Sequence, residues 1–210
     1  MQPKKKEEQQ SENKNEKQYK SKAKSFFGYF LPIYPLPIAL IGIFGALICI
    51  ITMIIAIPVP ATQGFINIGD ALVMITALLF GPIIGGLAGG IGSMFADIFL
   101  GYTLYAPATL LIKGAEGFIV GIISNPKKKK KRVDGRDVVS VILGGLIMVV
   151  GYFVYEVFLF GLNIALVEVF LNGLIQFGVG AILALLFILT ARKNISESIS
   201  QVFERIYKTQ

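Results

Sequence analysis

The chain alternates between long apolar runs and short polar segments. Crossing the hydrocarbon core of a bilayer takes about 20 helical residues, with roughly 17–25 tolerated. Runs of this kind predict helical spans at residues 36–57, 82–100, 107–125, 138–159 and 169–191. A shorter apolar run, 68–80, ends at Gly81-Pro82 and is predicted to be a further span, the second in chain order. The pattern therefore predicts an all-α integral membrane protein, a bundle of six transmembrane helices.

The segments between and beyond these spans are polar or turn-like. Residues 1–27 are rich in Lys, Glu, Gln and Asn and lack the apolar content to fold, so we expect a disordered tail. Residues 193–210 form a second polar tail, a short amphipathic helix whose apolar side holds Ile195, Ile199, Val202, Phe203 and Ile206. Residues 28–192 are then one membrane domain, with three turn-like loops on one side at 57–67, 101–106 and 160–168.

Basic residues are distributed unevenly between the two sides of this bundle. Six spans place both tails and the loop at 126–137 on one side. Of the 20 Lys and Arg residues, all except Lys113 lie on that side or at its edge. Because cytoplasmic segments carry the excess of Lys and Arg, both termini and this loop are predicted to be cytoplasmic.

The loop sequence PKKKKKRV, residues 126–133, taken alone has the form of a nuclear-import signal or a nucleic-acid-binding arm. Both interpretations need a soluble domain to carry the motif, and the pattern predicts none. We interpret the run as a topology anchor that contacts anionic lipid head groups. The lipid membrane, and no nucleic acid, is therefore the expected partner of the net charge of +7.

Composition narrows the function classes further. The chain is 54% hydrophobic and only 16% charged, which suits a bilayer as solvent. It has no His and a single Cys, Cys49, so the usual general base, a thiolate metal site and a disulfide framework are all missing. No GxxxxGK[ST] phosphate loop and no DxxxD-type repeat is present. We expect no catalytic residue, no cofactor and no metal.

Six ionisable residues lie within or at the edges of the spans, where a charge costs at least about 2.5–3.5 kcal/mol at mid-bilayer. They are Asp70, Asp97, Lys113, Glu116, Glu156 and Glu168. All six fall in the predicted outer half, and none in the inner half. Each alone is as well explained by ion pairing or interhelical glue as by ligand contact, and Lys113 is expected to pair with Glu116 and Asp97. Polar residues that only hold helices together would not be absent from the inner half, so we interpret the cluster as a binding site.

The spacing of polar residues gives these groups a common direction. A small-residue stripe at intervals of four ends in a carboxylate: Gly81, Gly85, Gly89, Ser93 and Asp97. A second stripe comprises Glu168, Asn172 and Gln176, and the outer loops add Gln63, Asn67, Tyr102, Tyr105 and Asn163. The predicted substrate-binding residues are Asn67, Asp70, Asp97, Tyr102, Lys113, Glu116, Tyr152, Glu156, Glu168 and Asn172. Such a site suits a small neutral heteroaromatic molecule, because a fully charged ligand would leave charges unpaired.

The first span carries a patch of small residues, Gly42, Gly45 and Ala46, and no polar residue nearby. Such a patch permits close helix packing, either inside the bundle or against another subunit. Together these features favour a membrane-embedded binder that takes its energy from partner proteins. The alternative is a stand-alone proton-coupled facilitator using Asp97 and Glu116.

Several motifs occur in order along the chain. They are N-x-G-D (Asn67, Gly69, Asp70), LFGP (79–82), G-S-x-x-A-D (92–97), A-P-A-T (106–109) and K-G-x-E-G (113–117). With them, residues 36–192 resemble the substrate-binding S components of energy-coupling-factor (ECF) vitamin transporters. The most similar branch is the one linked with hydroxymethylpyrimidine, pyridoxine and riboflavin-type substrates. The motifs are not specific for one vitamin.

The resemblance implies a six-helix bundle in the bacterial plasma membrane that captures its vitamin outside, beneath the loops at 57–67 and 101–106. It also implies a transmembrane T subunit and two ATPase subunits as partners. The small-residue patch on the first helix would dock on the T subunit, with Gly42 and Ala46 where the family often has two alanines. Pyridoxine or hydroxymethylpyrimidine is the leading expectation for the substrate.

Overall fold

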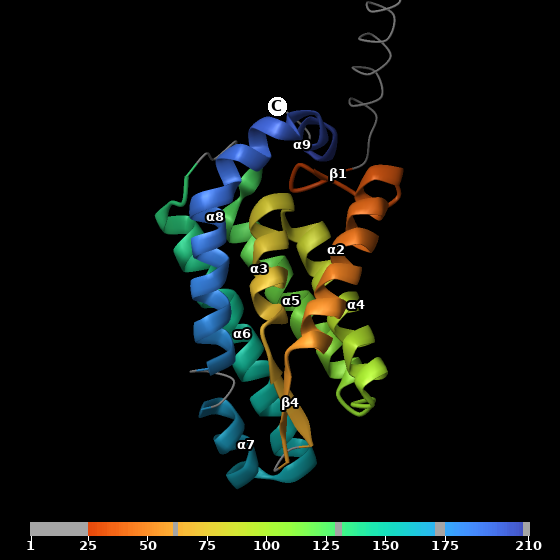
Figure 1. Cartoon of the computed structure of the whole chain (residues 1–210), viewed down its shortest axis with the longest axis vertical. Helices are drawn as coiled ribbons and strands as arrows, with labels where there is room; N and C mark the ends of the chain where they lie inside the picture. Colours follow the sequence, from red (N-terminus) through yellow and green to blue (C-terminus); the bar gives the residue numbers. More distant parts are fainter. Residues whose placement is uncertain (1–24, 61–62, 129–131, 171–174, 208–210) are drawn as a thin grey trace, which may run out of the picture.

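The structure, a computed structural model, describes residues 25–60, 63–128, 132–170 and 175–207. Within them lie helices α2 (Pro35–Ile54), α3 (Gly69–Phe80), α4 (Pro82–Leu100), α5 (Ala106–Ser124), α6 (Gly135–Phe160), α7 (Leu162–Phe170), α8 (Gly178–Ser198) and α9 (Ser200–Ile206), with a 3₁₀ turn, η1 (Pro126–Lys128). Strands β1 (Ser25–Phe26) and β2 (Tyr29–Phe30) pair antiparallel, as do β3 (Ala56–Val59) and β4 (Gly64–Asn67). The long helices run side by side in one bundle (Figure 1).

Proline and glycine set many of the helix ends. Helices α2, α4 and α5 each have proline in the first turn, where its missing N–H leaves no hydrogen bond unmade. Gly81 (φ 86°) separates α3 from α4, and Gly101 (φ 86°) ends α4 in the left-handed conformation. Helix α6 begins with a capping box in which Asp134 and Asp137 bond each other's backbone N–H groups.

The predicted spans correspond to helices of two kinds. In the described part of the chain, five helical segments are long and apolar enough to cross a membrane: α2, α4, α5, α6, and the stretch Leu162–Ser198, which includes the undescribed residues 171–174. The predicted second span is α3, which has 12 residues and so a length of about 18 Å, short of the about 30 Å hydrocarbon core. The protein is thus a multi-pass, all-α membrane protein, in which α3 is not a full-length span.

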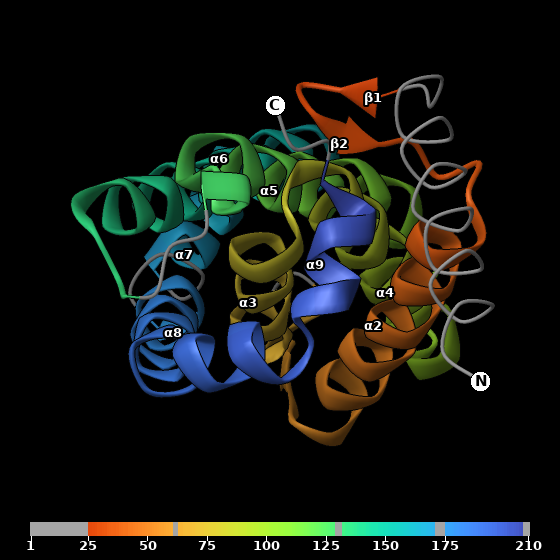
Figure 2. The same ribbon diagram turned by 90° about the horizontal axis from the view of Figure 1, so that it is seen from above.

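Helix α3 occupies the centre of the bundle. It packs against α2, α4, α5, α6 and α8, and Figure 2 shows it among these helices when the molecule is seen from above. All of its residues except Leu72 are buried. A short helix can lie at membrane depth here because protein, rather than lipid, surrounds it.

Two of the predicted loops have regular structure. The segment 57–67 forms most of the β3–β4 hairpin, with Ala56 opposite Asn67. The prediction of a loop at 160–168 is wrong, because α7 begins at Leu162, directly after Gly161 (φ 85°) has ended α6. Gly161 supplies the whole reversal, so no longer loop is needed and the apolar sequence that follows returns at once to helix.

The two ends of the bundle differ (Figure 1). The end with the β3–β4 hairpin and α7 is called here the hairpin end. The opposite end, called the termini end, holds both ends of the described chain together with η1 and the start of α6. There Tyr29 and Tyr207 form a β-bridge, and Lys127 donates to the carbonyl oxygen of Phe27. The first hairpin includes residues 25–27 of the predicted tail, and residues 1–24 lie outside the described residues.

An aromatic cluster closes the termini end. Helix α9 turns across it, and Ile195, Ile199 and Phe203 of the predicted apolar side pack on the core beside Phe80. The predicted tail is not a single helix, because α8 extends to Ser198 before α9 begins at Ser200. The rings of Phe80 and Phe203 stack at 5.6 Å. Burial raises the pKa of the Tyr207 phenol, whose hydroxyl donates to the carbonyl oxygen of Leu79.

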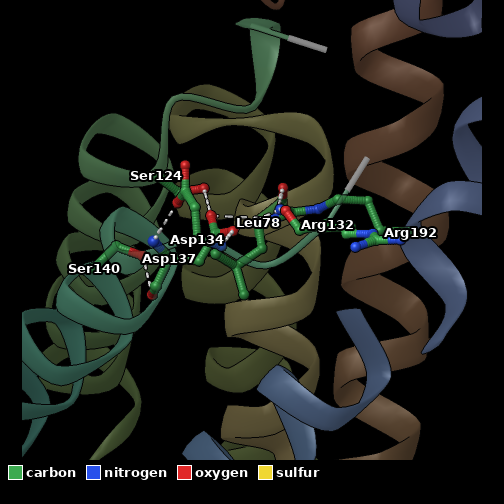
Figure 3. Close-up of polar contacts among 7 residues, drawn as sticks. All are labelled: Leu78, Ser124, Arg132, Asp134, Asp137, Ser140 and Arg192. Carbon is green, nitrogen blue, oxygen red and sulfur yellow. Dashed lines mark hydrogen bonds and ion pairs between the residues drawn. The ribbon is translucent and has the colours of Figure 1, made fainter. Parts of the chain in front are cut away.

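Beside this cluster lies a buried ion pair that the sequence did not indicate (Figure 3). The Arg192 guanidinium Nη1 is 2.6 Å from Asp137 Oδ2, and Arg192 and Asp137 are 2% and 0% exposed. Arg192 also donates to the carbonyl oxygens of Leu78 (3.1 Å) and Arg132 (3.3 Å). The Ser124 hydroxyl donates to Asp137 Oδ1 at 2.5 Å. The pair thereby ties α3, α5, α6 and α8 together.

Candidate functional site

A cavity with about 440 Å³ of empty space, counted to its open mouth, lies toward the hairpin end. Its walls come from α2, β4, α4, α5, α6, α7 and the turn before α8, each near the end closest to the β3–β4 hairpin. The lining residues are Thr52, Gly64, Phe65, Asn67, Ser93, Asp97, Tyr105, Thr109, Lys113, Tyr152, Glu156, Glu168 and Gln176. Most of them carry polar side chains, which is unusual for the interior of a membrane bundle.

The small-residue stripe of α4 places one wall of the cavity. A Cβ atom on Gly85 would lie 2.5 Å from the Ala77 Cβ atom of α3, and Gly89 is packed as closely against the same helix. Glycine is therefore required at both positions for α4 to approach α3. The same face of α4 continues to Ser93 and Asp97, which the close approach brings into the cavity wall.

Lys113 is the only cation of the cavity wall among the described residues, and it is fully engaged. It forms ion pairs with Asp70 Oδ1 and with Glu116 Oε2, the latter at 3.3 Å, and only 2% of it is exposed. The predicted partner Asp97 is not among its ion pairs in the described part of the chain. The prediction of Asp97 was wrong because Asp70 starts the central helix α3, directly facing α5, a juxtaposition that sequence spacing does not reveal.

Gln176 connects the hairpin to this ion pair. Its Nε2 atom donates to Asp70 Oδ2 at 2.9 Å, and its Oε1 atom accepts the backbone N–H of Asn67 at 3.0 Å. Asn67 in turn accepts the backbone N–H of Gly69 through Oδ1 at 2.8 Å. The hairpin, the first turn of α3 and the turn before α8 are thus joined by amide hydrogen bonds. Asn172, from the same predicted polar stripe, lies outside the described residues.

Tyrosine and threonine hydroxyls make up the wall between α5 and α6. Tyr105 donates to Glu156 Oε1 at 3.3 Å, and the hydroxyls of Thr109 and Tyr152 are 2.9 Å apart. The Lys113 ammonium lies 5.6 Å from the centre of the Tyr152 ring. Thr109 was not predicted, although it precedes Lys113 by four residues and so shares its helix face.

The remaining predicted site residues lie at varying distances from the cavity. Asp70 and Glu116 stand behind its wall and reach it through Lys113. Tyr102 does not line the cavity but packs on Phe65, which does, with ring centres 4.7 Å apart. The expected roof residues Gln63 and Asn163 are exposed and do not line the cavity. Their loops are shorter than expected, because regular structure occupies most of both segments.

Besides Thr109, six lining residues are absent from the predicted substrate-binding set: Thr52, Gly64, Phe65, Ser93, Tyr105 (expected only as part of the roof) and Gln176. Ser93 shares a stripe with Asp97, and Gln176 shares one with Glu168. This spacing could have identified both as site residues. Thr52 gives no such signal, because it is a lone hydroxyl in the apolar α2 helix and only the fold places it beside the cavity.

The predicted docking patch on α2 is divided between two surfaces. Gly45 is buried against α4, where an added Cβ would lie 3.7 Å from the carbonyl oxygen of Ala88. Gly42 and Ala46 are exposed, and nothing lies within 4 Å of a Cβ built on Gly42. Gly45 therefore serves packing within the bundle, which corrects its assignment to a partner surface, whereas the other two remain open.

The cavity and its second layer contain more negative than positive groups. Five carboxylates, each at most 4% exposed, accompany the single ammonium group: Asp70, Asp97, Glu116, Glu156 and Glu168. Among the described residues, Asp97 Oδ2, Glu156 Oε2, both Glu116 carboxylate oxygens and the Thr52 hydroxyl have no hydrogen-bond partner, although Glu116 Oε2 is ion-paired with Lys113. Buried polar atoms without partners are uncommon in folded proteins and indicate a group that is satisfied by something else.

The prediction that the inner half contains no buried charge is wrong. Asp137 and Arg192 form a buried pair at the termini end, as described above. Sequence reasoning assigned Asp137 to a loop and Arg192 to the edge of a tail, but α6 and α8 both extend beyond the predicted span limits. The distribution of charged residues between the two halves therefore cannot support the site. The cavity and its unpartnered oxygens support it instead.

The carboxylates do not converge on a point. Across the described ranges, no group of three or more Asp, Glu or Cys side chains is placed to hold a metal ion. They instead surround the cavity from several helices, an arrangement suited to a molecule of several atoms.

Comparison with known proteins places these features in context. A family model described as "ECF-type riboflavin transporter, S component" matches residues 35–193. An uncharacterized protein of Pyrococcus woesei is 44% identical over 129 residues, which cover 61% of this chain and 83% of that protein. The thiamine precursor transporter HmpT of Lactococcus lactis is 24% identical over 148 residues, 70% of this chain and 82% of HmpT. A UPF0397 protein of Streptococcus pneumoniae is 37% identical over 82 residues, 39% of this chain and 44% of its own length.

Proposed function

Because this chain belongs to the family of ECF-type riboflavin transporter S components, we propose that it captures a small vitamin or vitamin precursor from outside the cell for ATP-driven import. The protein is a vitamin-type substrate-binding transporter subunit and not an enzyme. The observation that carries the proposal is the buried polar cavity toward the hairpin end, with its ion pair and unpartnered carboxylate oxygens.

The proposed substrate is a small heteroaromatic vitamin or precursor, with pyridoxine and hydroxymethylpyrimidine-like molecules first. Tyr105 and Tyr152 offer ring faces to an aromatic ligand, and the Asn67, Thr109 and Gln176 side chains offer hydrogen bonds to polar substituents. A relative named as a thiamine precursor transporter supports a ligand of this size and kind.

The proposed orientation places the hairpin end outside the cell and the termini end in the cytoplasm. Among the described residues, Lys127 bonds to Phe27 and Arg192 bonds to Arg132 at the termini end, which agrees with the excess of Lys and Arg on the cytoplasmic side. The ligand then enters from outside through the mouth of the cavity beside β4. The membrane is proposed to be the plasma membrane of a prokaryotic cell.

Energy for transport is proposed to come from a transmembrane T subunit and two ATPase subunits. The chain contains no phosphate-cradling loop of its own. The proposed docking surface on the T subunit is the exposed face of α2 around Gly42 and Ala46, where small side chains permit close helix contact. A Gly42→Leu variant should keep ligand affinity but lose assembly with the T subunit, measured by co-purification. Met53→Leu, also on α2 but conservative in size, serves as its control.

Reconstitution in liposomes tests the proposal directly. The protein alone should bind ligand without accumulating it, even with an imposed pH gradient, and uptake should appear when the T and ATPase subunits and ATP are added. The alternative, a proton-coupled facilitator using Asp97 and Glu116, predicts uptake by the protein alone driven by the gradient. Such uptake would overturn the proposal.

A further inference from the structure

The charge balance of the cavity leads to an inference about its ligand that rests on the proposed function. Of the six ionisable groups in or directly behind the wall, five are acidic and one is basic. A cavity with that balance disfavours an anion, which would add negative charge to a region that water does not screen. The groups of the wall that have no partner then determine which ligand charge the cavity favours.

Lys113 is not available to neutralise a ligand. Its ammonium group is already paired with Asp70 and Glu116, and Asp70 receives a further hydrogen bond from Gln176. Leaving this arrangement for a ligand anion would expose two buried carboxylates without a counter-charge, which is strongly unfavourable. Lys113 therefore acts within the wall, and the charged groups of the wall that keep unpartnered oxygens for a ligand are the carboxylates.

The unpartnered acceptors face the cavity from two sides of α5. Asp97 lies on α4 and Glu156 on α6, and α5 packs between these helices. Both side chains line the cavity and are 4% and 2% exposed. Asp97 Oδ2 and Glu156 Oε2 each lack a hydrogen-bond partner within the described part of the chain. Two buried carboxylates with a free oxygen each are matched by a ligand that brings N–H donors and positive charge.

We propose that the ligand is a small organic cation, an amino-substituted or ring-protonated heteroaromatic whose N–H groups donate to Asp97 and Glu156. The Tyr152 and Tyr105 rings in the same wall add favourable contacts for a cationic aromatic molecule. A metal ion is a poorer fit, because the carboxylates of the described residues do not converge on one point. The neutral ligand expected from the sequence rested on the argument that a fully charged ligand would leave charges unpaired, with Lys113 expected to pair with Glu116 and Asp97. In the structure Asp70 takes the place of Asp97, and Asp97 Oδ2 has no hydrogen-bond partner.

Two triplets of compounds test the proposal. Within each triplet the ring is the same, and one substituent is an amino, a hydroxyl or a carboxyl group. Pyridoxamine, pyridoxine and 4-pyridoxic acid carry an amino, a hydroxyl and a carboxyl group at the same position, and an aminomethyl, hydroxymethyl and carboxyl series on pyrimidine repeats the comparison. Affinity of the purified protein in detergent is measured by calorimetry at one pH. The amino member should bind at least about tenfold more tightly than the hydroxyl member, since a hydrogen bond to a charged group contributes about 1.5–3 kcal/mol. The acid should bind most weakly.

Variants locate the effect. Asp97→Asn and Glu156→Gln keep the shape of each side chain and should each lower the affinity for the amino member several-fold more than the affinity for the hydroxyl member. Glu204→Gln is the matched control, because Glu204 is exposed on α9 at the termini end.

Three results would overturn the inference, each in a distinguishable way. If the hydroxyl or acid member of a triplet binds as tightly as the amino member, the ligand is not selected by positive charge, and the proposed function stands. If no member of either triplet binds, the substrate class of the proposed function fails together with the inference. A preference for the amino member that persists in both carboxylate variants also contradicts the assignment to Asp97 and Glu156.

Discussion

The two buried ionic clusters of this bundle differ in how completely their polar atoms are used. At the termini end, one guanidinium meets one carboxylate, and both oxygens of Asp137 accept hydrogen bonds from Arg192, Ser124 or the Asp134 backbone. Toward the hairpin end, one ammonium accompanies five carboxylates and is ion-paired with two of them, while Asp97 and Glu156 each have an oxygen without a hydrogen-bond partner. The first cluster is complete as it stands, whereas we propose that a ligand completes the second.

The pairing of polar atoms distinguishes the two clusters, whereas burial does not. Both clusters contain side chains that are almost fully buried, and both join helices far apart in the sequence. A charge buried for structural reasons is paired and hydrogen-bonded, because an unpaired one would destabilise the fold. Excess charge and unpartnered oxygens around a cavity are therefore the features that distinguish a binding site from a buried ion pair that only stabilises the fold. Variants of each cluster should respond accordingly.

The largest effect is expected for Lys113→Ala. Removing the ammonium leaves Asp70 and Glu116 buried without a counter-charge, which should cost about 3–5 kcal/mol of unfolding free energy and abolish ligand binding. Thermal unfolding in detergent and calorimetric binding measure the two effects. Lys113→Met combined with Asp70→Asn and Glu116→Gln removes all three charges and should recover much of the stability but not the affinity. Recovery of affinity in the triple variant would show that the ion pair is only structural.

The next effect is expected for Arg192→Ala at the termini end. Asp137 would lose its buried counter-charge, and unfolding should become easier by about 3 kcal/mol. Ligand affinity per folded molecule should change less than about threefold, because the cluster is at the other end of the bundle. Adding Asp137→Asn should restore part of the stability, since the amide carries no charge. A tenfold loss of affinity in the single variant, measured on folded protein, would mean that the two clusters are coupled.

A moderate effect is expected for Gln176→Leu. The change leaves Asp70 Oδ2 and the Asn67 backbone N–H without their hydrogen bonds, at a cost of about 1–3 kcal/mol. Because these bonds hold the hairpin against α3, most of the loss should be seen as weaker ligand binding and faster ligand release in stopped-flow measurements. The expectation is wrong if ligand release is unchanged while global stability falls.

The smallest effect on ligand affinity is expected for substitutions in the basic loop. Replacing three of Lys127–Lys131 with Gln should leave ligand affinity unchanged, because Lys127 at the start of the run lies at the termini end. Membrane insertion and binding to vesicles with anionic lipid should weaken, by about 1 kcal/mol per removed Lys near the surface. Loss of affinity in this variant, with affinity kept in Lys113→Ala, would reverse the comparison between the two ends.

The apolar pattern predicted most of the helices, since span length and the proline and glycine boundaries are local properties of the sequence. It identified the α4 stripe and the amphipathic C-terminal segment for the same reason. The helix α7 was missed because Asn163 and Glu168 interrupt the apolar run, although Glu168 is buried against the cavity rather than exposed in a loop.

The pairing of charges could not be predicted in the same way. Lys113 and Asp70 are 43 residues apart, and Arg192 and Asp137 are 55 apart, so each pair depends on how the helices are arranged. Sequence spacing indicated only the partner of Lys113 on its own helix, Glu116. The short α3 helix illustrates the limit well, because its central position decides both which acid meets Lys113 and where the cavity lies.

An experimental structure with a bound ligand tests the central claim most directly. The account predicts ligand density in the cavity beneath the β3–β4 hairpin, with N–H groups within hydrogen-bond distance of Asp97 and Glu156, while Lys113 keeps its pairs with Asp70 and Glu116. Ligand density at the termini end, or a ligand anion that has drawn Lys113 away from these two acids, would contradict it.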